Sequence, residues 1–167
     1  MKKEILLTLA LAGFTIASNA QSTASATSTA TIVTPISITK NVDVSFGNIA
    51  VGASGGTVIL ATDGTRSTTG GVTLPTTTGT VTAADFTVTG TDTYTFSITL
   101  PTTPVTLTRA SGTETMDATA FTSTPSGSGT LSSGTKDVKV GATLTVAASQ
   151  AAGVYTSGDF DVTVNYE

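Results

Sequence analysis

Residues 93–100 read TYTFSITL and decide the fold class. In this stretch, threonine or serine alternates with bulkier apolar side chains, at Tyr94, Phe96, Ile98 and Leu100. An apolar side chain at every second position is typical of a β-strand with one face on a core and the other in water. Pro101 follows at once, and proline ends a strand because it has no backbone N–H to donate.

The same period of two recurs along the chain. Apolar residues occupy even-numbered positions in several runs, which include Val42, Val44 and Phe46, then Val58 and Leu60, Phe86 and Val88, Val138 and Val140, and Leu144 and Val146. Gly, Ser, Asp and Pro cluster between the runs at intervals of about 8–12 residues, as in sandwiches and barrels. Asp63 and Gly64 form one such turn signal, because Asp-Gly favours a tight hairpin. We therefore predict an all-β protein, an antiparallel β-sandwich of about seven to nine strands.

The composition excludes several function classes. The 167 residues include 40 threonines but no Cys, His or Trp, and the net charge is −4. Without Cys and His there is no disulfide framework, no sulfur-based metal site and no Ser-His-Asp machinery. An acidic chain without a basic tract is a poor nucleic-acid ligand. We expect no enzyme, no cofactor and no nucleic-acid partner.

The first twenty residues, MKKEILLTLALAGFTIASNA, have the features of a secretory signal peptide. Lys2 and Lys3 precede a short apolar run, and Ser18 and Ala20 supply small residues before a cleavage point at Gln21. The run is shorter than the ~20 residues that cross a bilayer. We expect residues 1–20 to be removed on secretion across the inner membrane. No membrane-spanning segment is expected in the mature chain, which would act in the periplasm, at the outer surface or in an extracellular fibre.

Residues 21–31 differ from the rest of the mature chain. They are small and polar, with apolar alternation limited to Ala24, Ala26 and Ala30. Such a segment is disordered alone but can become an edge strand beside a partner edge. We treat residues 21–31 as an N-terminal extension and residues 32–167 as the sandwich domain. Ile32 either extends this candidate donor strand or begins the domain's own first strand.

Carboxylates are the remaining candidates for chemistry. Glu114 and Asp117 lie close in sequence. They are either a catalytic pair, such as a glycosidase needs on the two sides of a cleft, or part of a solvated turn. We favour the turn, because aromatic residues that could stack on a sugar are scarce. Asp159 and Asp161 share one side of an expected last strand and are either calcium ligands or ordinary solvent-facing residues. We expect no metal site. The two arginines are each expected to pair with a carboxylate at a sheet rim.

Several motifs in order carry a resemblance. Residues 31–52, TIVTPISITKNVDVSFGNIAVG, followed by Gly55, Gly56, the turn at Asp63 and the closing run 144–167, resemble the exported bacterial family DUF4402. The family name implies no function.

A looser resemblance is to spore coat U-type and other chaperone–usher pilus subunits. It rests on Phe46-Gly47 near the start and on the C-terminal pattern from Ala152 to Tyr166. This resemblance implies an immunoglobulin-like sandwich that lacks one strand, a homo-polymer partner and a periplasmic chaperone and usher. Assembly would use Ala24, Ala26, Ala30 and Ile32 as donor, with Gly153, Phe160, Val162, Val164 and Tyr166 lining the groove or core. Pilus subunits of the spore coat type usually carry a disulfide, which this chain lacks.

Two hypotheses follow. The first is a structural subunit of a surface fibre, fimbrium or adhesive coat, assembled by β-strand addition. The second is a self-complete secreted sandwich that binds a surface glycan or an envelope protein. A carboxylate-based hydrolase is a distant third.

Overall fold

The computed structural model describes residues 21–167; the expected signal peptide, residues 1–20, lies outside the described residues. The described chain has 13 strands and no helix. The strands are β1 Ser37–Val42, β2 Ser45–Phe46, β3 Ala50–Leu60, β4 Arg66–Thr73, β5 Val81–Thr82, β6 Ala84–Thr89, β7 Thr95–Thr99, β8 Val105–Arg109, β9 Thr115–Thr124, β10 Ser128–Thr130, β11 Thr135–Val146, β12 Tyr155–Thr156 and β13 Thr163–Tyr166. The all-β prediction is therefore confirmed. The strand number exceeds the predicted seven to nine because four of the 13 strands are fragments of two or three residues.

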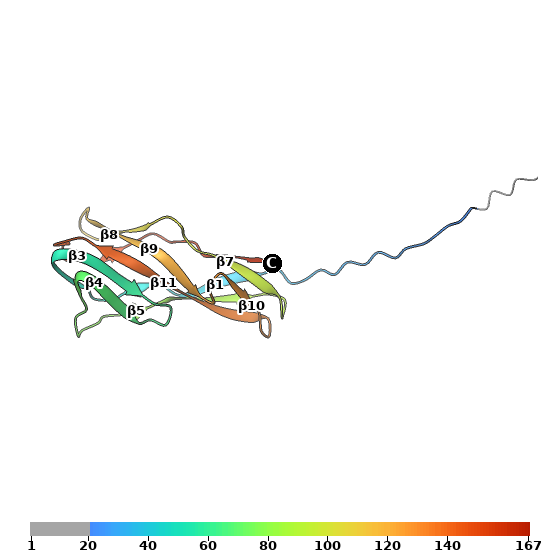
Figure 1. Cartoon of the computed structure of the whole chain (residues 1–167), viewed down its shortest axis with the longest axis horizontal. Helices are drawn as coiled ribbons and strands as arrows, with labels where there is room; N and C mark the ends of the chain where they lie inside the picture. The colour runs from blue at the N-terminus through green and yellow to red at the C-terminus, as the bar shows by residue number, and fades with distance from the viewer. Residues whose placement is uncertain (1–20) are drawn as a thin grey trace, which may run out of the picture. The chain divides into compact units, whose positions relative to one another are not determined.

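The larger layer is an eight-stranded antiparallel sheet. Its main path runs β1-β6-β11-β9-β8-β12, and β3 pairs with both β11 and β4. The 12-residue β11 is the central strand, since its first half pairs with β6 and its second half with β3. Figure 1 shows β9 and β11 along the middle, with β3 and β4 toward one end and β7 and β10 toward the other.

The second layer is uneven. The three-stranded sheet β10-β7-β13 covers one half of the large sheet, and the two-stranded sheet β2-β5 covers the other. Side chains between the layers form two buried clusters. The first joins β6, β7, β11 and β13 around the fully buried Phe96, and the second joins β3, β9 and β11 around Leu60 and Leu144. The fold is an antiparallel β-sandwich whose second half has the thinner cover.

The N-terminal segment is a separate unit that ends at Ile32, and the compact unit covers Val33–Glu167. Residues 21–32 are exposed and belong to no strand, and Ile32 is 98% exposed. Ile32 does not open the domain's first strand, which begins at Ser37, and its place in a donor strand stays a prediction.

A bulge in β9 changes which side of the strand is buried. Ala118 and Ser123 are both buried although they are five positions apart, an odd offset that puts two residues on opposite faces of a regular strand. In the pairing with β11, Thr119 and Thr122 lie opposite Thr143 and Gly141, so β9 holds one extra residue between these pairs. Ala120 has a φ of 47° at this point, as in bulges whose extra residue is left-handed.

Several local predictions are confirmed and others are wrong. Asp63 and Gly64 do form the β3–β4 turn, and β7 does end at Thr99, before the prolines. The last strand is shorter than predicted, because β13 begins at Thr163 and leaves Phe160 and Val162 half-buried outside any strand. Val42 was expected on the apolar face but is 39% exposed, because the β1 register shifts between Lys40 and Val42.

Candidate functional site

A groove of about 1010 Å³ opens in the thinly covered half of the sandwich. Its floor consists of apolar side chains of the large sheet, at Val105, Leu107, Met116, Ala118, Leu144 and Val146. These six residues are called the floor residues below. Much of the remaining lining comes from two chain segments, residues 43–51 and residues 150–160.

The groove exists because the second layer is incomplete here. The sheet that faces this half consists of β2 and β5, each only two residues long. Three of the floor residues, Val105, Leu107 and Met116, are consequently only half-buried. The other three are buried, as are Val88 and Val138 under the three-stranded sheet. Apolar surface left open in a groove is typical of an interaction site.

One border of the groove is the connection between β11 and β13, residues 147–162, which we call the strap. It contains a single strand fragment, β12, which pairs Tyr155 with Arg109 and Thr156 with Thr108 on β8. The amide of Ala110 also donates to the carbonyl of Val154 at 2.9 Å. The strap therefore docks on the edge of the large sheet through few backbone contacts.

Tyr155 organises the strap. Its hydroxyl donates to the backbone carbonyl of Ala151 at 2.7 Å and accepts from the side-chain amide of Gln150 at 2.9 Å. The same Gln150 amide also reaches the carbonyl of Thr115 at 3.2 Å. These bonds close residues 150–155 into a small loop beside the groove.

Arg109 links the β8–β9 hairpin to the strap. Its guanidinium makes a two-point ion pair with Glu114, with distances of 2.7 and 3.0 Å, and a longer contact of 3.4 Å with the carbonyl of Ala152. The hydrogen bond from Arg109 lowers the pKa of Glu114 and raises the pKa of Arg109. The predicted arginine–carboxylate pairing is thus confirmed for Arg109. For Arg66 it is wrong, because Arg66 donates to the carbonyls of Phe46 and Asn48.

The structure brings together only part of the predicted assembly residues. Gly153 and Phe160 both line the groove. Val164 lies in β13 within the first buried cluster, and Val162 and Tyr166 pack against that cluster. The predicted donor residues are exposed and lie in no strand, at Ala24, Ala26, Ala30 and Ile32. Sequence reasoning missed the floor residues on β8 and β9, although the alternation of Val105 and Leu107 with threonine was a usable signal.

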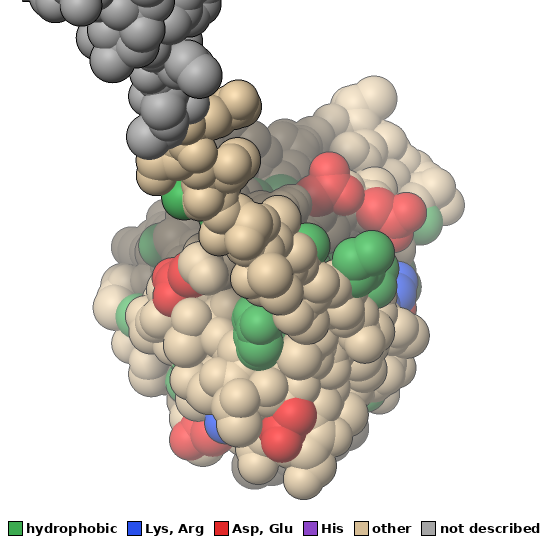
Figure 2. Space-filling model, turned by 90° about the vertical axis from the view of Figure 1, so that its right-hand side faces the viewer, with side chains coloured by type: hydrophobic (Ala, Val, Ile, Leu, Met, Phe, Trp, Pro, Cys, Tyr) green, Lys and Arg blue, Asp and Glu red, His purple; other side chains and the backbone are tan. Residues whose placement is uncertain are grey.

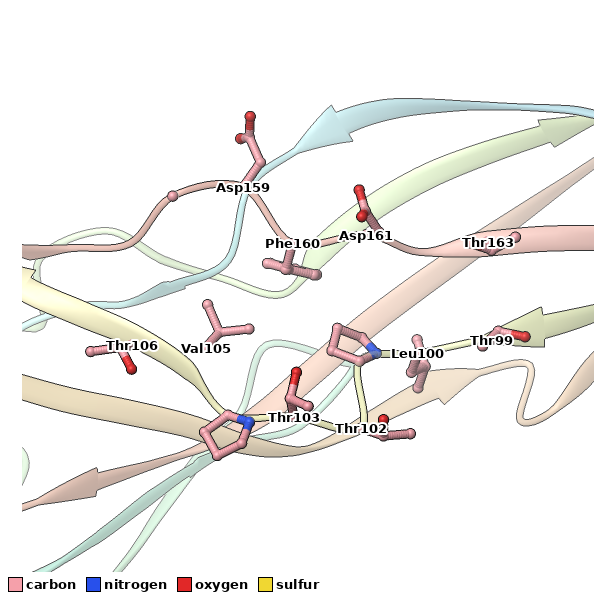
Figure 3. Close-up of a pocket in the computed structure, with 13 residues that line it drawn as sticks. Thr99, Leu100, Thr102, Thr103, Val105, Thr106, Asp159, Phe160, Asp161 and Thr163 are labelled. Atoms are coloured by element: carbon pink, nitrogen blue, oxygen red, sulfur yellow. The ribbon is translucent and has the colours of Figure 1, made fainter.

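The acidic residues that raised chemical alternatives are held in other contacts or point elsewhere. Glu114 binds Arg109, and Asp117 accepts a hydrogen bond from Thr106 at 2.7 Å. A second pocket, of about 560 Å³, is lined by Val105, Asp159, Phe160 and Asp161 among others. In Figure 3, Phe160 points toward Val105, while Asp159 and Asp161 point to the opposite side. No group of three or more acidic side chains placed to hold a metal ion occurs within residues 21–167.

The outer face of the large sheet carries rows of hydroxyl groups. One row crosses five strands, and its members lie directly opposite one another in the pairing of β4, β3, β11, β9 and β8, at Thr69, Thr57, Thr145, Asp117 and Thr106. Thr57 and Thr69 share a hydrogen bond of 2.8 Å. Figure 2 shows a different side of the molecule, where separate acidic, basic and hydrophobic side chains are scattered over a surface of other side chains and backbone.

The comparisons with known proteins give one match. The family model described as a domain of unknown function, DUF4402, matches residues 36–166. No curated protein and no solved structure matches the chain. Among residues 21–167, no helix has the length and apolar character needed to cross a membrane.

Proposed function

The chain belongs to the DUF4402 family, and we propose that it is an exported structural protein, a pilin-like subunit of a cell-surface fibre or coat that assembles by β-strand addition. In this mechanism, an extended segment of one subunit adds a strand to the sandwich of the next. Backbone hydrogen bonds supply affinity, and alternate side chains set the register.

One observation carries the proposal: the apolar groove and the unpaired N-terminal segment occur in the same chain. The floor residues lie under a layer that supplies only two short strand fragments. Residues 21–32 are exposed and take part in no strand. A segment that lacks a partner and a sandwich that lacks part of a layer are complementary when two copies meet.

Open strand edges support the same proposal. Within the described chain, β13 pairs only with β7, and β1 pairs only with β6. Each edge keeps a row of backbone N–H and C=O groups that a further strand can use. An immunoglobulin-like arrangement of the strands, as pilus subunits have, stays a prediction.

The donor side chains are small. Ala24, Ala26 and Ala30 each bury little surface, worth about 1 kcal/mol or less at roughly 25 cal/mol per Å². Ile32 is the largest apolar residue next to them. Binding would therefore depend mainly on backbone pairing, and growth of the polymer would need a periplasmic chaperone and usher to keep free subunits apart.

The test is deletion of residues 21–31 followed by electron microscopy of the exported protein. We expect polymers from the intact chain and only monomers from the deletion variant. Ala26→Pro is a second variant with full length, because proline removes a backbone donor from a paired strand; Ala26→Val is its matched control. Polymers that form unchanged in both disrupted variants would refute the donor role.

A second candidate function is favoured by the hydroxyl rows on the outer face. A self-complete sandwich could use the row through Thr145 to bind a surface glycan or an envelope protein. This alternative requires a stable monomer with a cooperative melt when the exported chain is expressed alone. Size-exclusion chromatography separates the two functions, since the fibre subunit without its chaperone is expected to polymerise or aggregate.

A further inference from the structure

We propose that the strap covers the groove of the unassembled subunit, and that its tip, residues 150–157, moves aside when residues 21–32 of a second copy enter. The inference rests on the strand-addition function proposed above and adds its regulation. The strap and the donor strand would compete for the same apolar floor.

The position of the strap is the first step of the argument. All residues from Gln150 to Phe160 line the groove, so a strand laid over the floor residues meets the strap. The strap is also the border with the least regular structure, because only Tyr155 and Thr156 are in a strand.

The strap buries little of itself, which makes its displacement inexpensive. Val154 is 68% exposed, and Ala152 and Gly153 are exposed as well. Residues 147–153, AASQAAG, contain no bulky apolar side chain. Free energy lost on undocking therefore comes mainly from a few hydrogen bonds.

Those hydrogen bonds divide into an internal set and a docking set. Tyr155 and Ala151 bond within the strap, so the tip keeps its shape as it moves. Docking to the sheet depends on the β8 pairing, on the Ala110–Val154 backbone bond, on the Gln150–Thr115 bond and on the longer Arg109–Ala152 contact. Just before the tip, the amide of Ser149 also donates to the carbonyl of Gly52 on β3. Because β12 pairs only two residues with the five-residue β8, a longer incoming strand has more backbone partners to gain.

The N-terminal segment of a second copy fits as the occupant. Its 12 residues span about 40 Å when extended, at roughly 3.3 Å per residue. This is longer than the nine-residue segment 43–51 that lines the groove could be if it were fully extended. Residues 21–32 carry no charge, in keeping with the uncharged floor.

Locking the strap with a disulfide tests the inference, and the chain has no other Cys to interfere. Thr108 and Thr156 are directly opposite each other in the β8–β12 pair, and both are exposed. Thr108→Cys with Thr156→Cys joins strap to sheet. Thr99→Cys with Thr163→Cys makes the matched bond between β7 and β13, away from the strap tip.

The measurement is fluorescence anisotropy of a labelled peptide of residues 21–35, titrated with the exported chain that lacks residues 21–31, which keeps the whole compact unit and is expected to stay monomeric. We expect the peptide to bind the unmodified chain and the oxidised β7–β13 control equally. The oxidised strap variant should bind at least tenfold more weakly and recover on reduction. Gln150→Ala, which removes the side-chain hydrogen bond from the strap to Thr115 without adding a new bond, should bind at least threefold more tightly.

The outcomes separate the two proposals. Equal binding by the oxidised and reduced strap variant, with mass spectrometry showing the bond formed, overturns the strap inference and leaves strand addition standing. Weaker binding by Gln150→Ala also overturns it. Absence of binding to every form, the unmodified chain included, contradicts strand addition itself and the strap inference with it.

Discussion

Arg109 and Glu114 face each other across the β8–β9 hairpin in a two-point ion pair, with Nε 2.7 Å from Oε2 and Nη2 3.0 Å from Oε1. Two parallel N–H donors on one carboxylate fix both side chains in place. The aliphatic part of Arg109 lies against Gly153, where a Cβ would approach the Arg109 Cδ to 2.9 Å. The ion pair therefore holds in position the surface on which the strap rests.

Acid should weaken this ion pair. The hydrogen bond from Arg109 lowers the pKa of Glu114 in the folded protein, so its stabilising contribution is present above the ordinary value of 4.5. That contribution is lost as the pH falls through the lowered pKa of the folded state. We expect the urea midpoint to fall between neutral pH and strongly acidic pH by less in Glu114→Gln than in the unmodified chain. An equal fall in both would contradict the assignment.

Ala120→Gly should stabilise the protein. Ala120 has a φ of 47°, and a left-handed conformation costs a residue with a Cβ about 1–2 kcal/mol. Glycine removes that cost but adds about 0.5–1 kcal/mol of backbone entropy, so the expected net gain is ~0.5 kcal/mol. Urea denaturation measures it. The control is Ala118→Gly on the same strand. Ala118 is buried and lies in the regular part of the strand, so this variant should lose about 1 kcal/mol or more of the free energy of unfolding.

The β9 bulge also shows where sequence reasoning stops. Alternation predicted strands correctly because each inward side chain must be apolar, as Phe96 and Ile98 in β7 are. The bulge adds one residue, so the buried positions are even-numbered before it, as at Ala118, and odd-numbered after it, as at Ser123. The left-handed residue of the bulge is Ala120 and not a glycine, so the sequence carries no signal for it. The bulge depends on pairing with β11, a strand that is distant in sequence, so local pattern does not contain it.

The candidate site was predictable only in part, for a related reason. Gly153 and Phe160 were identified, and both line the groove. Val105, Leu107 and Met116 have the pattern of ordinary core residues, and they form a groove floor only because the facing layer is short. The absence of a facing strand is a property of the whole topology, which no single run of residues encodes.

Gly141→Ala should destabilise the sandwich. A Cβ at Gly141, in the middle of β11, would lie 2.2 Å from the carbonyl oxygen of Leu60. That neighbour is backbone in a buried strand, so relief requires the strands to separate, at a cost of about 1–3 kcal/mol. The matched control is Gly52→Ala in β3, where no atom lies within 4 Å of the new Cβ. The free energy of unfolding of the Gly52→Ala variant should stay within about 0.5 kcal/mol of that of the unmodified chain.

Tyr166→Phe should loosen the start of the compact unit. The Tyr166 hydroxyl accepts from the amide of Thr91 at 2.7 Å and donates to the carbonyl of Thr34 at 2.8 Å. Removing it leaves the partly buried Thr91 amide without its acceptor, which costs about 1–3 kcal/mol. Hydrogen exchange should then accelerate at Thr91 and Thr34.

The control for this prediction is Tyr94→Phe. The Tyr94 ring packs edge-on against Tyr166 with centroids 5.5 Å apart, and phenylalanine keeps that contact. We therefore expect exchange at Thr34 to be unchanged in Tyr94→Phe. Equal acceleration in both variants would contradict the assignment of the Tyr166 hydroxyl as the group that fixes the point at which the N-terminal segment leaves the domain. A hydroxyl that fixes this point also sets the length of chain free to pair with a second copy.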